Sequence, residues 1–389
     1  MPTPHSLFGR YIHLAGSANR NRPAALVCYA HELLRDLTIA ILAQGGGLVL
    51  FAGKEPLQDE AVANSPALTF DWTILETVDE VTSRGKLPWP HTWPPIVVVT
   101  SEKATSEIPQ KRRALWDRLL GSGLLRVDYI QPGARSGALL RERQAQFGTV
   151  FVCMGGGTGV EHLADLYQSR QRPVIPLDID LGASRDDGIG GSARMHREAM
   201  ANPNSFLRLN PQRAASGAAL LAAASTQNGS KERSKVVGSL MQLLGAIDLP
   251  KAFYIRMLNE QLPEFPMVER FFREIVDPVI ESIGYRRIEM GTDPTEHGFI
   301  NAEIFERLHY SELAIADVTG LRSNCFIELG YALGHQIPVI VTAKKETELP
   351  FDQDAIPCHF WNPDTDVETS QLRLLEFIER NIGRPSLVA

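Results

Sequence analysis

The chain has 389 residues, 44% of them hydrophobic and 22% charged, which is enough apolar material for ordinary cores and a length typical of two domains. Lys and Arg total 39 against 46 Asp and Glu, and the net charge of -7 argues against a dedicated nucleic-acid binder. The sequence has neither an apolar run of ~18 residues nor a secretory pattern at its start, so we expect a cytoplasmic protein with no membrane partner. The four cysteines lie far apart without a C-x-x-C pair, which predicts reduced thiols and no metal site.

Strand-like and helix-like segments alternate from the beginning of the chain, a pattern typical of parallel sheets with crossover helices. The expected strands cover residues 10–15, 48–51, 94–100, 149–154 and 173–177, and the expected helices cover residues 30–43 and 161–168. The composition then changes to an alanine-rich helix at 214–224 and a polar run at 225–234. We therefore expect a first domain over residues 1–225 and a linker with a bridging helix over 226–250.

The same alternation restarts in a second domain, residues 251–389. Its expected strands cover residues 252–256, 313–316 and 337–342, and its expected helices cover residues 268–283 and 326–334. Pro278 should kink the first of these helices. The sequence thus predicts an α/β protein made of two Rossmann- or flavodoxin-like domains with parallel sheets.

Glycine-bearing turns follow three expected strands of the first domain. In an open parallel sheet, ligands bind beyond the carboxyl ends of the strands, and glycine lets backbone N–H groups approach a phosphate closely. The run from Met154 to Glu161 (MGGGTGVE) suits a nucleotide phosphate or ribose, although no Lys follows the glycines as in a Walker loop. The alternative is a tight turn without a ligand. The candidate ligand-binding residues are Gly16, Ser17, Gly53, Gly155, Gly156, Gly157, Thr158, Gly159 and Glu161.

Three of these features occur together: Gly16-Ser17 after the first strand, three glycines before the second, and G-G-G-T-G-V-E after a late strand. In this order they resemble the SLOG superfamily over residues 8–210. That superfamily includes the LOG nucleotide phosphoribohydrolases and sensor domains that bind nucleotide-derived ligands in bacterial conflict systems. In the hydrolytic members the signature is similar to P-G-G-x-G-T-x-x-E, and its Glu acts with an upstream Arg.

This chain departs from the hydrolytic signature. Met154 replaces the Pro and the order of Gly and Thr is inverted, so Glu161 matches only approximately. Arg141 and Arg143 are both open as the upstream Arg. These departures favour a ligand-binding sensor over a working hydrolase.

In the second domain, the stretch from residue 317 to 334 (DVTGLRSNCFIELGYALG) carries two carboxylates at an expected strand–helix junction. Asp317 ends an apolar strand, so its carboxylate belongs at the ligand edge of the sheet. Glu328 lies in the first turns of the next helix among apolar neighbours, where a carboxylate is partly desolvated and fixed in direction. A positioned carboxylate stabilises or attacks the oxocarbenium-like state through which an N-glycosidic bond breaks. The alternative is that Asn324 caps the helix and Glu328 is a surface residue.

Further motifs accompany this stretch, in the order Tyr254, Gly284-Tyr285, Asp293, I-A-D-V-T-G, N-C-F-I-E-L-G-Y-A-L-G, Pro338-Val-Ile340 and Pro350-Phe-Asp352. The order resembles the nucleoside 2-deoxyribosyltransferase-like proteins over residues 250–365, a flavodoxin-like group with relatives among TIR-type NAD hydrolases. The resemblance implies that Glu328 is the nucleophile or oxocarbenium stabiliser and that Asp317 holds the ribose or phosphate-sugar. The substrate-binding residues it implies are Tyr254, Asp293, Asn324 and Gly330.

This stretch also departs from its family. Arg322 and Ser323 stand where the family often has Asn-Pro, and Ile327 stands where it often has Tyr. The departures are consistent with an altered substrate or with a binding domain that has lost activity.

The two resemblances together imply a signal-gated effector in bacterial antiviral defence. Its second domain would hydrolyse the N-glycosidic bond of a nucleotide such as NAD, as a substrate and with no cofactor, while its first domain senses a nucleotide-derived ligand. Sites of the second kind are often completed between subunits, so a homo-oligomer is expected. Two alternatives stay open: a housekeeping nucleotide phosphoribohydrolase that uses the first domain's site, and a non-catalytic nucleotide-binding protein.

Overall fold

The computed structural model describes residues 7–55, 65–87, 89, 91, 93–131, 133, 136–182, 190–288, 300–350 and 356–382. The described chain forms two α/β units, an N-terminal unit that extends to Asp248 and a C-terminal unit that begins at Leu249. Each unit is built on a purely parallel sheet, and this confirms the predicted fold class.

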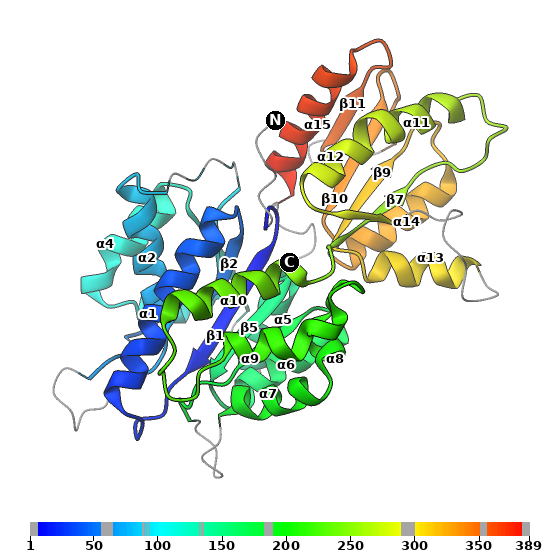
Figure 1. Ribbon diagram of the computed structural model, residues 1–389. Helices are drawn as coiled ribbons and strands as arrows, with labels where there is room; N and C mark the ends of the chain where they lie inside the picture. The colour runs from blue at the N-terminus through cyan, green and yellow to red at the C-terminus, as the bar shows by residue number, and fades with distance from the viewer. Residues whose placement is uncertain are drawn as a thin grey trace. The chain divides into compact units, whose positions relative to one another are not determined.

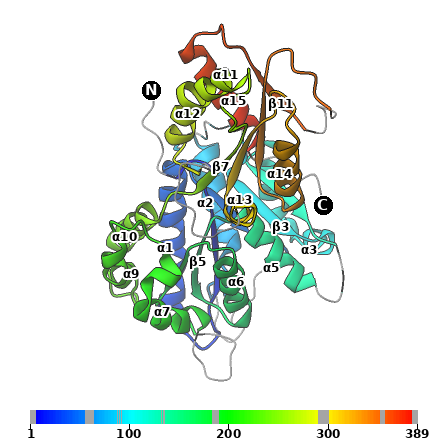
Figure 2. The same cartoon turned by 90° about the vertical axis from the view of Figure 1, so that its right-hand side faces the viewer.

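The N-terminal unit has a six-stranded sheet in the order β4-β3-β2-β1-β5-β6. Its strands are β1 (Tyr11–Ser17), β2 (Gly47–Leu50), β3 (Ile96–Thr100), β4 (Leu125–Tyr129), β5 (Val150–Gly155) and β6 (Val174–Leu177). Its helices are α1 (Ala24–Ala43), α2 (Asp71–Ser83), α3 (Glu102–Ser106), α4 (Gln110–Gly121), α5 (Ser136–Phe147), α6 (Thr158–Ser169), α7 (Gly191–Ala201), α8 (Pro203–Leu207), a 3-10 turn (Ala214–Ser216), α9 (Gly217–Ala224) and α10 (Arg233–Ala246). Figure 2 shows α1 on one face of this sheet and α5 and α6 on the other.

Apolar side chains on both faces of the central strands explain this doubly wound arrangement. Val49, Val97 and Val99 form a small core on the face where α5 supplies Leu140 and Phe147. Alternate residues of the same strands pack on the opposite face under α1, which buries nine of its side chains. Strands buried on both faces read as continuous apolar runs, which is why four-residue sequences such as β2 were recognisable.

Helix α10 belongs to the N-terminal unit. Its Val236, Leu240, Leu243 and Leu244 are fully buried in that unit's core, and Arg233 pairs with Asp36 on α1 at 3.0 Å. The residues expected to form a linker over 226–250 are therefore largely packed structure. The polar composition of 225–234 describes a turn on the surface of this unit.

The C-terminal unit has a five-stranded sheet in the order β11-β10-β9-β7-β8. Its strands are β7 (Lys251–Ile255), β8 (Arg286–Ile288), β9 (Leu313–Asp317), β10 (Val339–Lys344) and β11 (Cys358–Trp361). Its helices are α11 (Phe265–Phe271), the π-helical segment η2 (Phe272–Val276), α12 (Asp277–Ser282), α13 (Ile300–His309), α14 (Ser323–Gly334) and α15 (Val367–Asn381). Counted from the unit's first strand, the order is 2-1-3-4-5, which is the flavodoxin-like order.

Helices cover both faces of this sheet as well. In Figure 1, α11, α12 and α15 lie on one face of the C-terminal sheet, and α13 and α14 lie on the other. The kink expected at Pro278 takes the form of the π-helical segment immediately before it. Proline has no N–H to donate to the carbonyl of Glu274, and that carbonyl instead accepts a hydrogen bond from Gln371 Nε2 of α15 at 2.7 Å.

Candidate functional site

The carboxyl edge of the C-terminal sheet is where the chain crosses from β9 into α14. Strand β7 lies between β8 and β9, so the strand order reverses there, and ligands of open α/β sheets bind at such a point. The turn after β9 is tight, with Gly320 at φ +74° and Leu321 at φ +51°. A Cβ on Gly320 would lie 3.1 Å from Met257 Cε, so the loop after β7 borders the same edge.

Glu328 is half-buried on α14, the helix that follows this edge. The core-facing side of the helix is formed by Cys325, Leu329 and Ala332, and Glu328 lies next to that stripe at helical spacing. Burial raises the pKa of Glu328 to about 7. The pKa of the Cys325 thiol rises to about 12, by burial first and then by the negative charges of Glu328 and Asp317.

Asp317 is held inside the sheet edge by three donors. Its side chain is 1% exposed. Oδ1 accepts from the Thr319 backbone N–H at 3.1 Å, and Oδ2 accepts from Thr342 Oγ1 and Trp361 Nε1, both at 2.8 Å. Burial raises the pKa of this carboxyl, while its hydrogen bonds act in the opposite direction. The carboxylate therefore joins the ends of β9, β10 and β11, and its expected contact with a ribose remains a prediction.

The other predicted substrate residues are not all brought to Glu328. Asn324 and Gly330 lie on the exposed side of α14. Tyr254 lies on the opposite face of the sheet, where its ring packs on Phe272 at 5.0 Å and its hydroxyl donates to Asp277 Oδ1 at 3.0 Å. Asp293 lies outside the described residues. Strand alternation explains Tyr254, because Phe253 and Ile255 face the α14 side.

In the N-terminal unit, the glycines at the ends of β1 and β5 are required first by close packing of backbone. A Cβ on Gly16 would lie 2.0 Å from the Met154 carbonyl oxygen, and one on Gly155 would lie 2.2 Å from the Ser17 carbonyl oxygen. Gly155 and Gly156 also have positive φ, of +59° and +72°. The Gly156 N–H donates to the Ser17 carbonyl at 2.9 Å, so it is already used within the fold.

Gly53 is packed less closely than these glycines, against side chains and not against backbone. It is buried after β2, and an added Cβ would meet the Phe51 ring at 3.1 Å and Ala104 at 3.3 Å. The tight-turn alternative thus accounts for Gly16, Gly53 and Gly155 without a ligand. It does not account for the residues that follow the turn.

Gly157 is the N-cap of α6, with Thr158 and Gly159 in the first turn, where backbone N–H groups lack intrahelical acceptors. Glu161 lies one turn further, and its Oε1 is 4.0 Å from Arg194 Nε on α7. An N–H from Gly191 at the start of α7 donates to the Gly156 carbonyl at 2.8 Å. The predicted glycine turn, Glu161 and α7 therefore form one assembly at the carboxyl edge.

The structure separates the two candidate arginines. Arg143 is committed to Asp128, with Nε to Oδ1 at 2.6 Å and Nη2 to Oδ2 at 3.0 Å. Arg141 reaches α6: its Nε donates to His162 Nδ1 at 2.8 Å, and its Nη1 would lie 3.7 Å from a Cβ on Gly159. Arg141 is therefore the cation beside the first turn of α6. The sequence could not choose, because the two residues are two positions apart on one helix.

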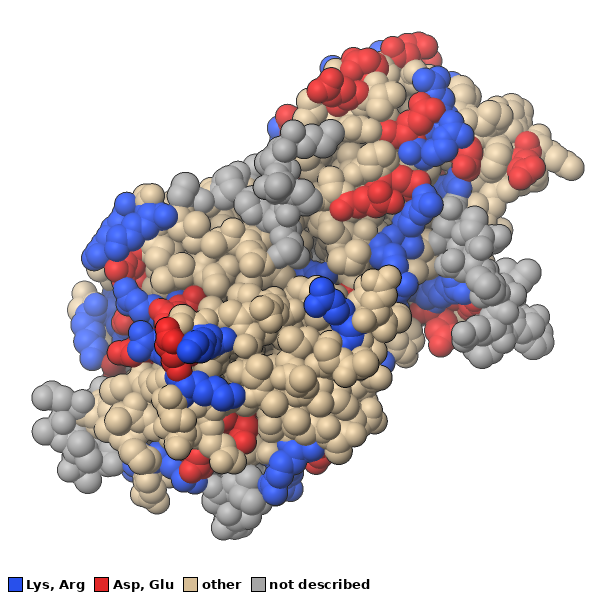
Figure 3. Space-filling view, viewed as in Figure 1, with Lys and Arg blue, Asp and Glu red and all other residues tan. Residues whose placement is uncertain are grey.

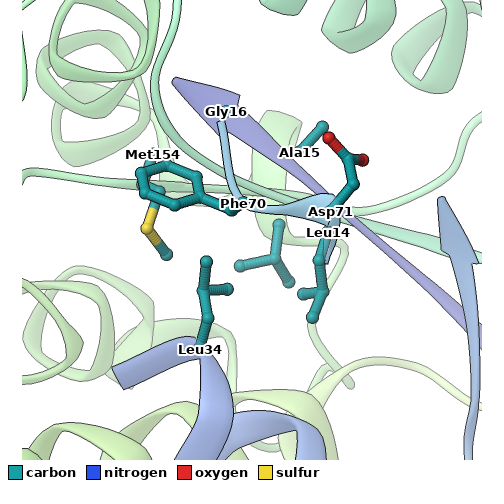
Figure 4. A pocket seen from close by; sticks show the side chains of 8 residues that line it. Leu14, Ala15, Gly16, Leu34, Phe70, Asp71 and Met154 are labelled. Carbon is teal, nitrogen blue, oxygen red and sulfur yellow. The ribbon is translucent and has the colours of Figure 1, made fainter. Parts of the chain in front are cut away.

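Sequence reasoning missed Asp71, the first residue of α2. It lines a small, water-sized cavity together with Leu14, Ala15, Gly16, Leu34, Phe70, Val152 and Met154. In Figure 4 its carboxylate lies beside Ala15 and points away from Leu34. Burial raises the pKa of Asp71 to about 6. The only sequence signal was an acidic residue in the first turn of a helix, a feature that many helices share.

Three further observations concern metal binding, surface charge and membrane-spanning helices. Within the described ranges, no three His, Cys, Asp or Glu side chains are placed to hold a metal ion. On the face seen in Figure 3, cationic and anionic side chains are interspersed, without an extended basic surface. In the same part of the chain, no helix is both long and apolar enough to cross a bilayer.

Comparison with known proteins gives one family. Residues 7–244 match the family described as ATP nucleosidase Cap17-like, N-terminal. Two relatives named ATP nucleosidase Cap17, one from Escherichia coli strain KTE188 and one from Escherichia coli, are 31% identical to this chain over 198 residues. The match takes in 50% of this chain and 37% of each relative, so the chain spans well under half the length of these proteins.

Solved structures are less similar. DNA processing protein A from Helicobacter pylori, described for its single-stranded DNA binding, matches with a TM-score of 0.33 and 12% identity over 60% of this chain and 81% of that one. UDP-GlcNAc 2-epimerase from Neisseria meningitidis matches with a TM-score of 0.23 and 9% identity over 97% and 95% of the two chains. At these TM-scores the similarity says nothing about function.

Proposed function

The chain belongs to the Cap17-like family of ATP nucleosidases, and from this membership we propose that it is a nucleotide N-glycosidase whose reaction takes place beside Glu328. The N-terminal unit, which carries the family match, would bind a nucleotide-derived ligand at the turn before α6. The resemblance of the two halves to SLOG and nucleoside 2-deoxyribosyltransferase-like proteins supports this division of labour.

The observation that carries the proposal is the state of the Glu328 side chain. It is half-buried on α14, the helix that follows β9, and burial raises its pKa to about 7. A carboxylate that is costly to ionise gains most when a positive charge develops next to it. Glu161 differs, because it lies beside the cationic Arg194 on α7.

The chemistry follows from that charge. As the C1′–N bond breaks, the base leaves with the bonding electrons and the sugar becomes oxocarbenium-like. Adenine takes up a proton as it leaves, whereas the nicotinamide of NAD leaves neutral and takes up none. The Glu328 carboxylate stabilises this cation or bonds to C1′. The oxygen of a water molecule then bonds to C1′ and the water loses a proton; where Glu328 has bonded to C1′, that bond breaks at the same time and its electrons return to the carboxylate. The products are the free base and the phosphorylated sugar.

Asp317 has a positioning role in this scheme. Its three hydrogen bonds fix the end of β9 against β10 and β11, and the turn from Val318 to Arg322 then leads into α14. A fixed strand end limits the drift of the helix that carries Glu328, and catalytic geometry tolerates little drift.

Adenine nucleotides are the first substrates to test. The name of the relatives specifies ATP, and the resemblance of the C-terminal unit to TIR-type proteins points to NAD. The exposed Ile327, which stands where the transferase-like group often has Tyr, directly precedes Glu328 on α14. We propose hydrolysis of one or both nucleotides.

A second candidate function has one specific observation in its favour. The family match covers residues 7–244 and thus falls on the N-terminal unit, where Glu161 and Arg141 stand near the same helix turn. In that case the N-terminal unit itself would cleave the nucleotide. Parallel substitution of Glu161 and Glu328 distinguishes the two candidates.

Gating, assembly and biological role complete the proposal. A ligand that binds one assembly state better than another shifts the chain toward that state, so an oligomer that completes the C-terminal site would couple sensing to hydrolysis. The setting would be antiviral defence in the bacterial cytoplasm. These parts rest on the two resemblances.

The test is a substrate panel read by mass spectrometry. The full chain is incubated with ATP, ADP, AMP, NAD and their deoxy forms, with and without cyclic oligonucleotides and ADP-ribose derivatives. We expect free adenine, or nicotinamide from NAD, together with the matching sugar phosphate. A chain that consumes no nucleotide under any ligand would be a binding protein instead of an enzyme.

A further inference from the structure

We propose that Asp71 accepts hydrogen bonds from the vicinal hydroxyls of the ribose of a nucleotide bound to the N-terminal unit, and so selects ribonucleotides over 2′-deoxyribonucleotides. The inference rests on the proposed function in one respect, namely that this unit binds a nucleotide at the turn before α6. The chemistry of recognition is that of a carboxylate facing a diol.

Position is the first argument. Asp71 Oδ1 accepts from the backbone N–H of Phe51, which directly follows β2, at 3.3 Å. In dinucleotide-binding folds an acidic residue at the end of the second strand binds the ribose hydroxyls. Here the start of α2 supplies a carboxylate at that place, beside Gly16 at the end of β1 and next to β5.

Rigidity is the second argument. The segment before α2 is tied to β1, because Thr69 bridges Ser17 and the Ala18 N–H donates to the Leu68 carbonyl at 2.8 Å. On α1, His31 contacts residues that precede and follow Asp71 in the chain: its Nδ1 is 2.7 Å from Thr73 Oγ1, and its Nε2 is 2.7 Å from the Ala67 carbonyl. The carboxylate is therefore held in place before a ligand arrives, which reduces the cost of binding.

The surroundings are the third argument. Apart from Asp71, the cavity is lined by the backbone end of β1 and by apolar side chains, chiefly Leu34, Phe70 and Met154. In such a setting a carboxylate favours a neutral partner with two donors over water, and burial already raises its pKa to about 6. It is mainly ionised at pH 7.5, so it accepts hydrogen bonds and does not donate them.

Hydrogen–deuterium exchange of the full chain locates the binding. Peptides covering residues 65–75 are followed during titration with ATP and with 2′-deoxy-ATP in the Glu328→Gln background, which limits consumption of the nucleotide. Because the readout belongs to these peptides, nucleotide bound at the C-terminal unit does not contribute to it. The same titrations are run on Asp71→Asn and on Asp117→Asn, a control at an exposed position on α4.

With Asp71 present, we expect half-protection by ATP at a concentration about tenfold lower than by 2′-deoxy-ATP, the loss expected for one hydrogen bond to a charged group. Asp71→Asn should bring the two concentrations together, and Asp117→Asn should keep them apart. If ATP and 2′-deoxy-ATP reach half-protection at equal concentrations in the chain that retains Asp71, the proposal is overturned. This measurement requires no variant at position 71. So does a tenfold difference that survives Asp71→Asn.

A different result separates this inference from the proposed function. If no nucleotide protects residues 65–75 while the wild-type chain still releases free base, the ribose contact is wrong and the C-terminal reaction stands. If ATP protects the segment at a lower concentration than 2′-deoxy-ATP but no base is released, Asp71 binds the ribose in a chain that is not an enzyme.

Discussion

Glu328 lowers the stability of the folded chain when it ionises, because its carboxyl lies where ionisation is unfavourable. The folded pKa of about 7 lies above the ordinary Glu value of 4.5. The folded state therefore holds the proton more tightly than the unfolded chain, and the free energy of unfolding falls as pH rises from 4.5 to about 7. Catalytic groups commonly carry such a cost.

Glu328→Gln should accordingly raise the melting temperature of the full chain at pH 8 by about 2–4 °C, because the amide cannot ionise. At pH 5 the carboxyl of the folded wild type is protonated and the pH lies close to the ordinary Glu value of 4.5, so most of the gain should disappear. Calorimetry at the two pH values measures this. Glu348→Gln, at an exposed position, serves as the control. An equal effect of Glu328→Gln at both pH values would count against a buried carboxylate at 328.

At this scale the sequence placed Asp317 at a strand end and Glu328 on the following helix, since an apolar run ending in an acidic residue is a local pattern. It could not show that Thr342 and Trp361, 25 and 44 residues further on, donate hydrogen bonds to the Asp317 carboxylate. Nor could it place Tyr254 on the far face of β7, because that depends on which face α14 covers.

Asp317 shows how one side chain joins three strands. Thr342→Val keeps the shape of a fully buried side chain on β10 but removes a donor to the buried carboxylate. We expect the free energy of unfolding to fall by about 2–3 kcal/mol. Thr342→Ser keeps the donor and should cost about 1 kcal/mol, for the lost methyl group.

Urea denaturation of both Thr342 variants compares the two costs. A Val variant as stable as the Ser variant would mean that the hydroxyl does not support Asp317.

Close packing around Gly148 decides how β5 and α6 meet. A Cβ there would lie 1.7 Å from the Tyr167 hydroxyl, which is fully buried and 3.1 Å from His13 Nδ1. Burial lowers the pKa of His13 to about 3, so it is neutral at ordinary pH. The Arg172 guanidinium closes the cluster, because its Nη1 donates to the Gly148 carbonyl at 2.6 Å.

Gly148→Ala should lower the free energy of unfolding by about 2–3 kcal/mol, because Tyr167 must move out of a filled core. Gly238→Ala on α10 is the matched change, since nothing lies within 4 Å of its added Cβ, and helix propensity should stabilise it by up to ~1 kcal/mol. Chemical denaturation measures both. If Gly148→Ala were as stable as Gly238→Ala, the core around Tyr167 would have room for a methyl group, contrary to the close packing described.

Elements with continuous apolar sequences were predictable, and those that depend on partners were not. Strands β2, β3 and β5 are buried along their whole length and stand out in the sequence. Strand β4 has one buried residue out of five, so its sequence carries no such signal. The π-helical segment before Pro278 needs Gln371 from another helix to satisfy a carbonyl.

At the scale of the whole chain, the sequence predicted two α/β units, and the structure has two. Composition marks residues 225–234 as polar, whereas the unit's core continues through Leu243 and Leu244 of α10. Strand order was likewise beyond the sequence. It decides which strand ends are neighbours, and therefore that Asp71 joins β1 and β5 at one edge.

The most direct test of the central claim is the rate of free-base release from ATP and NAD by the full-length wild type, Glu328→Gln and Glu161→Gln. The variants remove one carboxyl each, one from either unit. We expect Glu328→Gln to lose at least about 10³-fold in turnover and Glu161→Gln to keep the wild-type rate once its ligand is saturating. Undiminished release by Glu328→Gln, with release abolished in Glu161→Gln, would contradict the account and move the reaction to the N-terminal unit.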